Sequence, residues 1–233
     1  MDTPPVSLHH APMSDQHALV IGATGLVGSL VVERLLATPS CAAVTVLARR
    51  PSHRSHPKLV WRVVDFDDPG SWALPPGTTL FNCMGTTIKQ AGSQEEFQRV
   101  DHHIPLAVAR AAHAVGAQHC LSVSSLGASS RSTVFYSRVK GQLEEALQQV
   151  GFARLDILRP SLLLGERAHK RFGEQIGALA MRGLGFLLQG PLRQYRGIAG
   201  DAVAAAMVEL ASAVEPGVYV HPSPRLARGS LLT

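Results

Sequence analysis

The chain has 233 residues, 45% hydrophobic and 17% charged, so it is long enough to bury a complete hydrophobic core. Its formal net charge is +5, but aromatic residues make up only 5% and no basic stripe is visible, which argues against a nucleic-acid groove. The three cysteines, Cys41, Cys83 and Cys120, form no C-x-x-C pair and indicate a reduced, cytoplasmic protein.

Residues 1–16 mix proline, histidine and acidic residues without an apolar run, which is typical of a disordered leader rather than a signal peptide. The most apolar segment, residues 176–188, is interrupted by Arg182 and three glycines, so we expect a pocket wall or a partner-facing helix and no membrane span. None of the eleven histidines lies at a recognised metal-ligand spacing. We therefore expect no metal site.

Residues 18–28, ALVIGATGLVG, have the pattern of a short apolar strand, a glycine-rich turn and the start of a helix over residues 26–36. In such a turn glycine permits a tight bend and close approach of the backbone to a pyrophosphate, which the helix N-terminus then attracts. The spacing is G-x-x-G-x-x-G rather than G-x-G-x-x-G, and a turn that binds nothing is the alternative. We expect this turn to bind a dinucleotide through Gly22, Thr24, Gly25, Leu26, Val27 and Gly28.

A second apolar strand, residues 43–48, ends in Arg49 and Arg50. A site that prefers NAD has an acidic residue about 20 positions after the glycines, where it accepts the ribose hydroxyl. Two guanidinium groups instead suit the 2′-phosphate of NADP, because arginine donates to phosphate oxygens in pairs. The alternative is an exposed pair of loop arginines.

Two further strands bring more candidate cofactor contacts to the same edge. A strand over residues 58–64 ends at Asp65, which either bonds the adenine amino group or serves as a turn residue, and at Phe66, which can flank the base. A strand over residues 79–83 ends at Met84 and Gly85, where glycine allows backbone approach.

The remaining pattern alternates strands and helices. We expect helices over residues 93–116, 133–150 and 200–213, the last with Asp201 as N-cap, and strands over residues 119–123, 153–158 and 218–220. This alternation predicts an α/β fold of Rossmann type, a doubly wound parallel sheet with a small C-terminal region on the substrate side. We expect residues 17–233 to form a single NAD(P)-binding domain.

Tyr136 and Lys140 are four residues apart on a predicted helix, so both side chains lie on one face. An ammonium group beside a phenol favours the phenolate, which suits a tyrosine to acid–base work near neutral pH. Ser124 and Ser125 end the preceding strand and can hold a substrate oxygen beside the phenol.

The segments ATGLVG, SSLGA, YSRVKGQLEEAL and LRPSLLLGER together resemble the short-chain dehydrogenase/reductase superfamily of the atypical or extended kind, and within it the Tat-interactive oxidoreductase-like group. The resemblance covers about residues 17–220. It implies a Rossmann domain that binds NADP(H), with Tyr136 as catalytic acid or base and Lys140 on the nicotinamide ribose. It also implies Ser125 or Ser124 at the substrate oxygen and Pro160 near the nicotinamide. Asp101 stands where many members have an asparagine that supports a proton relay.

These residues favour an NADP(H)-dependent oxidoreductase that transfers hydride to or from a small carbonyl or alcohol substrate. The alternative is a regulatory or redox-sensing protein that binds NADP(H) with little or no turnover. A protein partner or a second copy of the chain is left open, and neither nucleic acid nor membrane is expected as a partner.

Overall fold

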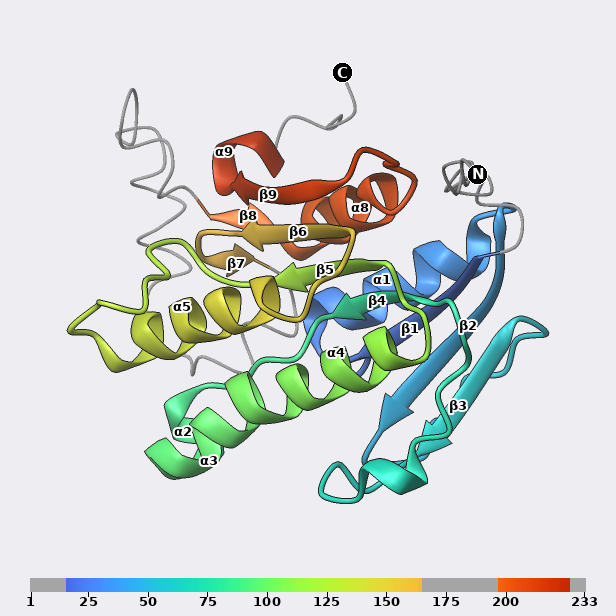
Figure 1. Cartoon of the computed structure of the whole chain (residues 1–233), viewed down its shortest axis with the longest axis horizontal. Coiled ribbons are helices and arrows are strands. Elements are labelled where there is room, and N and C mark those ends of the chain that lie inside the picture. The colour runs from blue at the N-terminus through green and yellow to red at the C-terminus, as the bar shows by residue number, and fades with distance from the viewer. Residues whose placement is uncertain (1–15, 165–196, 227–233) are drawn as a thin grey trace, which may run out of the picture.

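The computed structural model describes residues 16–164 and 197–226, and its centre is a seven-stranded parallel sheet with helices on both faces (Figure 1). In spatial order the strands are β3 (Leu59–Val63), β2 (Cys41–Ala48), β1 (Gln16–Ile21), β4 (Thr79–Asn82), β5 (His119–Val123), β6 (Arg154–Arg159) and β9 (Gly217–Pro222). The chain order reverses between β1 and β4, which creates the crevice where such sheets bind ligands. The Rossmann-type doubly wound sheet is confirmed.

The two helical layers pack on opposite faces of the sheet. One face is covered by α1 (Leu26–Ala37) and α8 (Gly200–Leu210), which also pack on each other, and the other by α4 (Ile104–Ala114) and α5 (Phe135–Gln148) (Figure 1). The central strands contribute alternate residues to each core, as Leu19 and Val20 of β1 do. Burial on both faces explains why these strands are continuous apolar runs in the sequence.

Short elements complete the described chain. These are the helices α2 (Ile88–Ala91), α3 (Gln94–Gln98) and α9 (Ser223–Leu226), a 3-10 turn at Pro69–Ser71, and the paired strands β7 (Leu163–Leu164) and β8 (Ile198–Ala199). The expected leader and the expected apolar segment over residues 176–188 lie outside the described residues, except that Gln16 begins β1.

The helix expected over residues 93–116 is divided. It consists of α3, a π-helical turn at Arg99–His103, and α4, with the Ser93 hydroxyl accepting the Glu96 N–H as expected for an N-cap. Pro105 explains the interruption, because it has no amide hydrogen to donate to the carbonyl four residues earlier, that of Asp101. The π-helical turn therefore falls at Asp101.

The expectation that Asp201 caps its helix is wrong. Ala199 occupies the cap position of α8 without a side-chain hydrogen bond, while Asp201 lies in the first turn. Its carboxylate forms an ion pair with Arg34 of α1 at 2.7 Å. Asp201 thus links the two helices that cover one face of the sheet.

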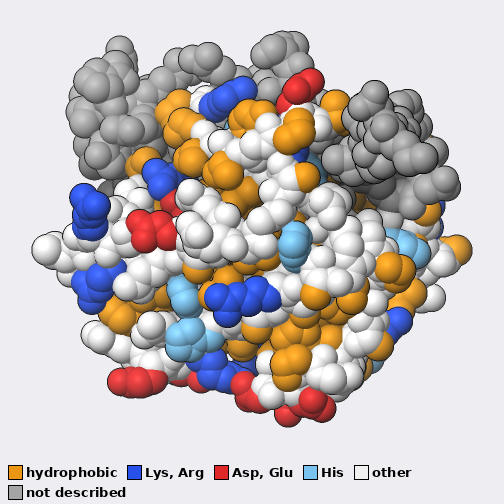
Figure 2. All heavy atoms as spheres, in the orientation of Figure 1, with side chains coloured by type: hydrophobic (Ala, Val, Ile, Leu, Met, Phe, Trp, Pro, Cys, Tyr) orange, Lys and Arg blue, Asp and Glu red, His pale blue; other side chains and the backbone are white. Residues whose placement is uncertain are grey.

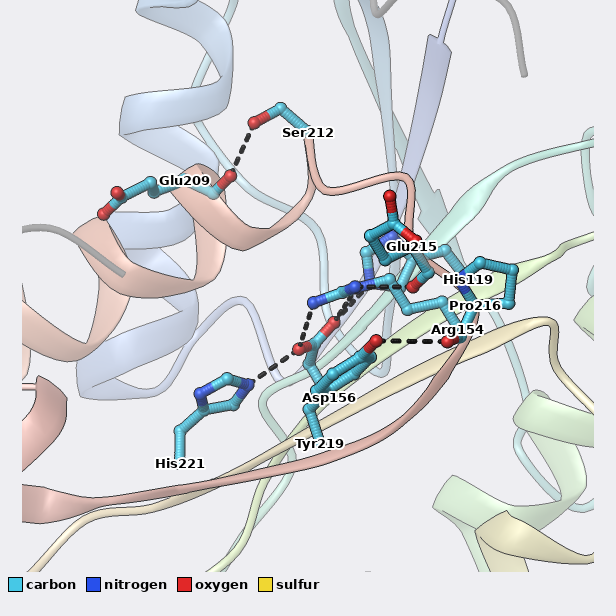
Figure 3. A network of polar contacts seen from close by, with 9 residues as sticks. All are labelled: His119, Arg154, Asp156, Glu209, Ser212, Glu215, Pro216, Tyr219 and His221. Atoms are coloured by element: carbon cyan, nitrogen blue, oxygen red, sulfur yellow. Dashed lines mark hydrogen bonds and ion pairs between the residues drawn. The ribbon is translucent and has the colours of Figure 1, made fainter. Parts of the chain in front are cut away.

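A buried polar cluster joins the last three strands (Figure 3). The Asp156 carboxylate, in the middle of β6, receives two hydrogen bonds from the Arg154 guanidinium, at 2.7 and 2.9 Å. The imidazoles of His119 on β5 and His221 on β9 each contact it at 2.7 Å. The ring of Tyr219 covers the guanidinium, which lies 4.1 Å from the ring centroid. We call these five residues the Asp156 cluster, and it ties the edge strand β9 to the sheet.

Candidate active site

The turn between β1 and α1 is closely packed against its surroundings. Gly22 has a φ angle of +78°, and a Cβ there would lie 2.3 Å from the Cys83 carbonyl oxygen. A Cβ on Gly28 would lie 2.3 Å from the Gly22 carbonyl oxygen, so α1 packs directly on the turn. The Gly25 N–H closes the turn by donating to the Gly22 carbonyl at 2.9 Å. Only glycine satisfies this geometry at positions 22 and 28.

The N-terminus of α1 is free to receive an anion. Gly25 occupies its cap position without a side-chain hydrogen bond, and the first turn contains no acidic side chain. Within the described residues, the first turn therefore brings no acidic side chain to these backbone N–H groups and the positive end of the helix dipole. This arrangement fits a phosphate group, and the tight glycine turn lets the backbone approach it.

A hollow of about 390 Å³ lies beside this turn, at the carboxyl ends of β1, β2 and β4. We call it the first hollow. The residues expected from the sequence that line it are Gly22, Thr24, Gly25, Arg49, Arg50, Met84 and Gly85. It is also lined by Phe66 and by side chains that the sequence did not single out, namely Leu47, Cys83, Thr86, Gln90, Glu96 and Val100.

Arg49 and Arg50 are exposed at the rim of the first hollow, directly after β2. Within the described part of the chain neither guanidinium has an ion pair or a hydrogen bond. The Arg50 carbonyl accepts the indole N–H of Trp61 at 2.9 Å, which ties this loop to β3. The loop backbone is thus held while both cationic groups are available to a ligand.

Asp65 is a turn residue in the structure. Its Oδ1 accepts the Asp67 N–H at 2.9 Å and its carbonyl accepts the Trp72 indole N–H at 2.8 Å. The neighbouring Phe66 lines the first hollow, but Asp65 does not. A bond from Asp65 to adenine stays a prediction.

A second hollow, of about 120 Å³, continues the first toward α5. The two share Gly25, Cys83, Met84, Gly85, Thr86 and Gln90, so they form one cleft along the sheet edge. The other residues that line the second hollow are Leu26, Val27, Thr87, Asp101, Val123, Ser124, Tyr136, Lys140 and Leu163. The glycine turn and the Tyr136–Lys140 pair therefore lie at the same carboxyl edge of the sheet and open into one cleft.

Tyr136 is one-third exposed, and its ring packs on the buried ring of Phe97 with centroids 5.6 Å apart. Lys140, one helical turn later, is buried. Burial alone would lower the pKa of Lys140, but the Asp101 carboxylate and the nearby Tyr136 and Glu144 outweigh it and raise this pKa above its usual value. The ammonium group is therefore held in its charged form beside the phenol.

Asp101, at the π-helical turn, is the direct partner of Lys140. The Lys140 Nζ lies 2.7 Å from Asp101 Oδ1, and both side chains are buried. The second carboxylate oxygen accepts the Thr86 N–H at 2.8 Å. This contact fixes the Asp101 carboxylate to the loop after β4, where it faces the cleft.

The two serines after β5 differ in their surroundings. Ser124 lines the second hollow and donates its hydroxyl hydrogen to the buried Glu144 carboxylate. Glu144 also forms an ion pair with Arg159, and this contact raises the pKa of the guanidinium. The Ser125 hydroxyl is buried, does not line the cleft and has no hydrogen-bond partner within the described residues. Ser124 is thus the serine placed at the cleft.

Two other expected cofactor residues do not line the cleft. Gly28 acts at a distance, by allowing α1 to pack on the turn. Pro160 is buried, and its carbonyl accepts the Leu126 N–H at 2.8 Å, which joins the chain after β6 to the chain after β5. A contact from Pro160 to a nicotinamide stays a prediction.

The distribution of charged side chains, the helix lengths and the possible metal ligands can be stated for the described residues. On the face in Figure 2, Lys and Arg side chains are interspersed with Asp, Glu and apolar groups. Residues 16–164 and 197–226 contain no helix long and apolar enough to cross a bilayer, and no group of three or more His, Cys, Asp or Glu side chains arranged so that it could hold a metal ion.

The sheet, the glycine turn and the shared cleft define an NAD(P)-binding Rossmann protein of short-chain dehydrogenase/reductase type. The chain belongs to the NAD dependent epimerase/dehydratase family, whose model matches residues 18–219.

Two curated relatives from fungi illustrate the similarity. The chain is 37% identical over 174 residues to "Protein FMP52, mitochondrial" of Eremothecium gossypii, covering 72% of this chain and 78% of the relative. It is 34% identical over 210 residues to "Protein fmp52, mitochondrial" of Aspergillus fumigatus, covering 85% and 90%. The expectation of a cytoplasmic protein is wrong by this comparison, because these relatives are named as mitochondrial. Unpaired cysteines indicate a reducing environment and do not distinguish one reducing compartment from another.

Solved structures share the fold at low identity. The ADP-L-glycero-D-manno-heptose-6-epimerase of Helicobacter pylori superposes with a TM-score of 0.67 at 17% identity, covering 91% of this chain and 78% of the epimerase. A short chain dehydrogenase of Leptospira borgpetersenii with bound NAD+ gives 0.64 at 14% identity, covering 92% and 94%.

Several residues in the cleft or directly behind it were missed by sequence reasoning. Glu144 had a usable signal, because it lies four residues after Lys140 and therefore on the same helix face. No sequence signal indicated that Asp101 is the ion-pair partner of Lys140, because this contact depends on the π-helical turn. Cys83 lines both hollows, but burial raises the pKa of its thiol to about 12, so the thiol stays protonated.

Proposed function

We propose that the protein is an NADP(H)-dependent oxidoreductase that interconverts a small carbonyl compound and its alcohol. The observation that carries this proposal is the single cleft that has the glycine turn at one end and Tyr136 with Lys140 at the other. A dinucleotide lying along the carboxyl edge of the sheet would bring its diphosphate to the turn and its nicotinamide toward the phenol.

The residues present fit such a cofactor. The tight turn that Gly22 and Gly28 make possible and the N-terminus of α1, which has no side-chain cap, suit a diphosphate. Arg49 and Arg50 would hold a 2′-phosphate at the rim of the first hollow, and the apolar Phe66 and Leu47 would contact the adenine. When bound, NADP(H) supplies or accepts the hydride, with its two electrons, at the reacting carbon of the substrate.

The residues of the chain then have to transfer one proton to or from the substrate oxygen and hold that oxygen in place. Tyr136 transfers the proton between its Oη and the substrate oxygen, and Lys140 lies in the same hollow, where it would bond the cofactor ribose. Ser124 stands at the same hollow but has already given its hydroxyl hydrogen to Glu144. It therefore offers lone pairs to a donor group of the ligand.

Nucleotide binding is tested by thermal unfolding with NADPH, NADH, 2′,5′-ADP or 5′-AMP. A ligand that binds only the folded state adds RT ln(1 + [L]/Kd), or about 2.7 kcal/mol at 100 times Kd. We expect NADPH and 2′,5′-ADP to raise Tm more than their counterparts without the 2′-phosphate. No change with NADPH or NADH at millimolar concentration would refute nucleotide binding. Binding without turnover of any carbonyl or alcohol tested would instead favour the regulatory alternative.

The double substitution Arg49→Ala/Arg50→Ala is expected to raise the Kd for NADPH by about 10- to 100-fold, because charge-assisted hydrogen bonds are worth about 1.5–3 kcal/mol. The Kd for NADH, measured by the same fluorescence titration, should change far less. Arg110→Ala removes one exposed arginine of α4 away from the cleft and serves as the charge control. Equal losses for both nucleotides would remove the two arginines from the phosphate site.

A further inference from the structure

Lys140 is compensated by buried negative charge on two sides. Asp101 Oδ1 lies 2.7 Å from its Nζ, and Glu144 lies one turn further along α5. Glu144 is in turn paired with Arg159 and accepts the Ser124 hydroxyl hydrogen. The four charged groups, Asp101, Lys140, Glu144 and Arg159, therefore alternate in sign, and their formal charges sum to zero.

The charged groups around the Tyr136 phenol can be placed element by element. Lys140 on α5 and Asp101 on the π-helical turn line the same hollow as the phenol. Arg138, also on α5, is directed to the Ser132 and Thr133 carbonyls and over the Phe135 ring. The phenol ring packs on the uncharged Phe97 of α3. Gly85, after β4, and Ser124, after β5, line the same hollow as the phenol and carry no charge.

An isolated lysine beside a tyrosine favours the phenolate, because the cation stabilises the anion. That effect is strong only when the cation has no closer counter-ion, since a neutral ion pair produces a field that falls off steeply with distance. Here the counter-ion is buried and in contact, so water does not screen it and it cannot swing away. The phenol thus experiences a pair rather than a bare ammonium group.

The backbone holds Asp101 in this position independently of Lys140. The Thr86 N–H donates to its second oxygen at 2.8 Å, and Gly85 lies close enough that a Cβ there would meet both Lys140 Nζ, at 3.6 Å, and Asp101 Oδ1, at 3.7 Å. Pro105 sets the π-helical turn that carries the carboxylate. The pairing is therefore part of the folded cleft.

We propose that Asp101 is a positioning residue that cancels the charge Lys140 would otherwise present to the Tyr136 phenol, so that the cleft works as a carbonyl reductase. The assignment of the reducing direction rests on the proposed oxidoreductase function. The cancellation of the Lys140 charge by Asp101 does not depend on that function. In the reducing direction the carbonyl carbon gains the hydride and the carbonyl oxygen takes the phenol proton. The resulting tyrosinate regains a proton from water, so atoms and electrons balance.

The electrostatic role is tested without any substrate by titrating tyrosinate absorbance. The chain contains only three tyrosines, so subtracting the titration of Tyr136→Phe isolates the signal of Tyr136. Asp101→Asn retains an oxygen for the Thr86 N–H and removes the negative charge. We expect it to move the Tyr136 midpoint to lower pH by about one pH unit. An unchanged or higher midpoint in the folded variant would overturn the proposal.

Two controls separate charge from structure. Asp67→Asn removes an exposed carboxylate that pairs with Arg99 of the same π-helical turn, and it should move the midpoint by less than about 0.2 pH unit. Asp101→Asn/Lys140→Met replaces the pair by two uncharged side chains and should leave the midpoint within about 0.3 pH unit of wild type. A larger shift in this double variant would overturn the proposal even where Asp101→Asn alone does not fold.

The direction is tested with 4-nitrobenzaldehyde and NADPH against 4-nitrobenzyl alcohol and NADP+ at neutral pH. Asp101→Asn should lower the ratio of reduction to oxidation rates by about tenfold, the factor that corresponds to one pH unit in the Tyr136 midpoint. An unchanged ratio together with the expected absorbance shift would overturn the reductase assignment. Absence of turnover in wild type would refute the proposed function, while the absorbance titration still decides the role of Asp101.

Discussion

Asp156→Asn should lower the free energy of unfolding by about 3–5 kcal/mol, because it removes the only carboxylate at the centre of the Asp156 cluster. The buried Arg154 guanidinium donates one hydrogen bond to each Asp156 oxygen, so in the variant it would lose its counter-charge and one of these two acceptors. It would keep the Glu215 carbonyl and the Tyr219 ring. Urea unfolding followed by circular dichroism measures the loss. Asp201→Asn, which breaks the exposed pair with Arg34, should cost less than about 1 kcal/mol.

Asp156 also makes the free energy of unfolding depend on pH. Burial would raise the pKa of Asp156, but hydrogen bonds from His119, His221 and Arg154 outweigh it and hold this pKa well below its ordinary value of 3.8. A group with a depressed folded-state pKa contributes stability that is complete above its unfolded pKa and is lost as the pH falls through the folded value. The acid decline below about pH 4 should therefore be shallower in Asp156→Asn. Parallel declines in the two proteins would contradict this assignment.

The Asp156 cluster also shows where sequence reasoning stops. His119, Asp156 and His221 come from β5, β6 and β9, and they meet because the three strands are neighbours in parallel register. Their spacings in the chain, 37 and 65 residues, carry no local signal. Polar residues in strands that are otherwise buried show only that a partner is needed.

The fold could be predicted because its signals are local. Strands buried on both faces are continuous apolar runs, and the glycine turn marks the passage from β1 into α1. The divided helix after Ser93 is the instructive exception. Its capping residue, Ser93, was predicted correctly. Pro105, however, cannot donate a backbone hydrogen bond to the Asp101 carbonyl, and the α-helical hydrogen-bond pattern gives way to a π-helical turn at Asp101. A periodicity argument treats such a run as one helix.

The candidate site follows the same division. Tyr136 and Lys140 could be paired from their spacing alone, because four residues in a helix bring two side chains to one face. The choice between Ser124 and Ser125 could not be made, since it depends on which way the chain turns after β5 and on a contact with Glu144, 20 residues away. The contact between Asp101 and Lys140 joins residues 39 positions apart and depends on the π-helical turn at Asp101, so it could not be predicted either.

Tyr136→Phe is expected to lower NADPH-dependent reduction of 4-nitrobenzaldehyde by about 10²- to 10⁴-fold, the range for loss of a general acid. Phenylalanine keeps the ring that packs on Phe97 and removes only the hydroxyl that serves the second hollow. The fold and the first hollow are therefore preserved, and the Kd for NADPH should stay within about twofold of wild type. Stopped-flow absorbance of the nicotinamide and a fluorescence titration measure the two quantities separately.

Tyr219→Phe is the matched control, because it removes the same atom from a tyrosine on β9 whose hydroxyl donates to the Pro216 carbonyl at 3.1 Å, away from the cleft. Its turnover should remain within about threefold of wild type. If both variants kept wild-type turnover, proton transfer would have to come from another group at the cleft. Ser124 is poorly placed for that task, because its hydroxyl hydrogen is already directed to the Glu144 carboxylate, which is ion-paired with Arg159. Hydroxyl groups of the described residues at the second hollow belong to Thr86, Thr87, Ser124 and Tyr136, and among these the phenol lies one helical turn from the buried Lys140.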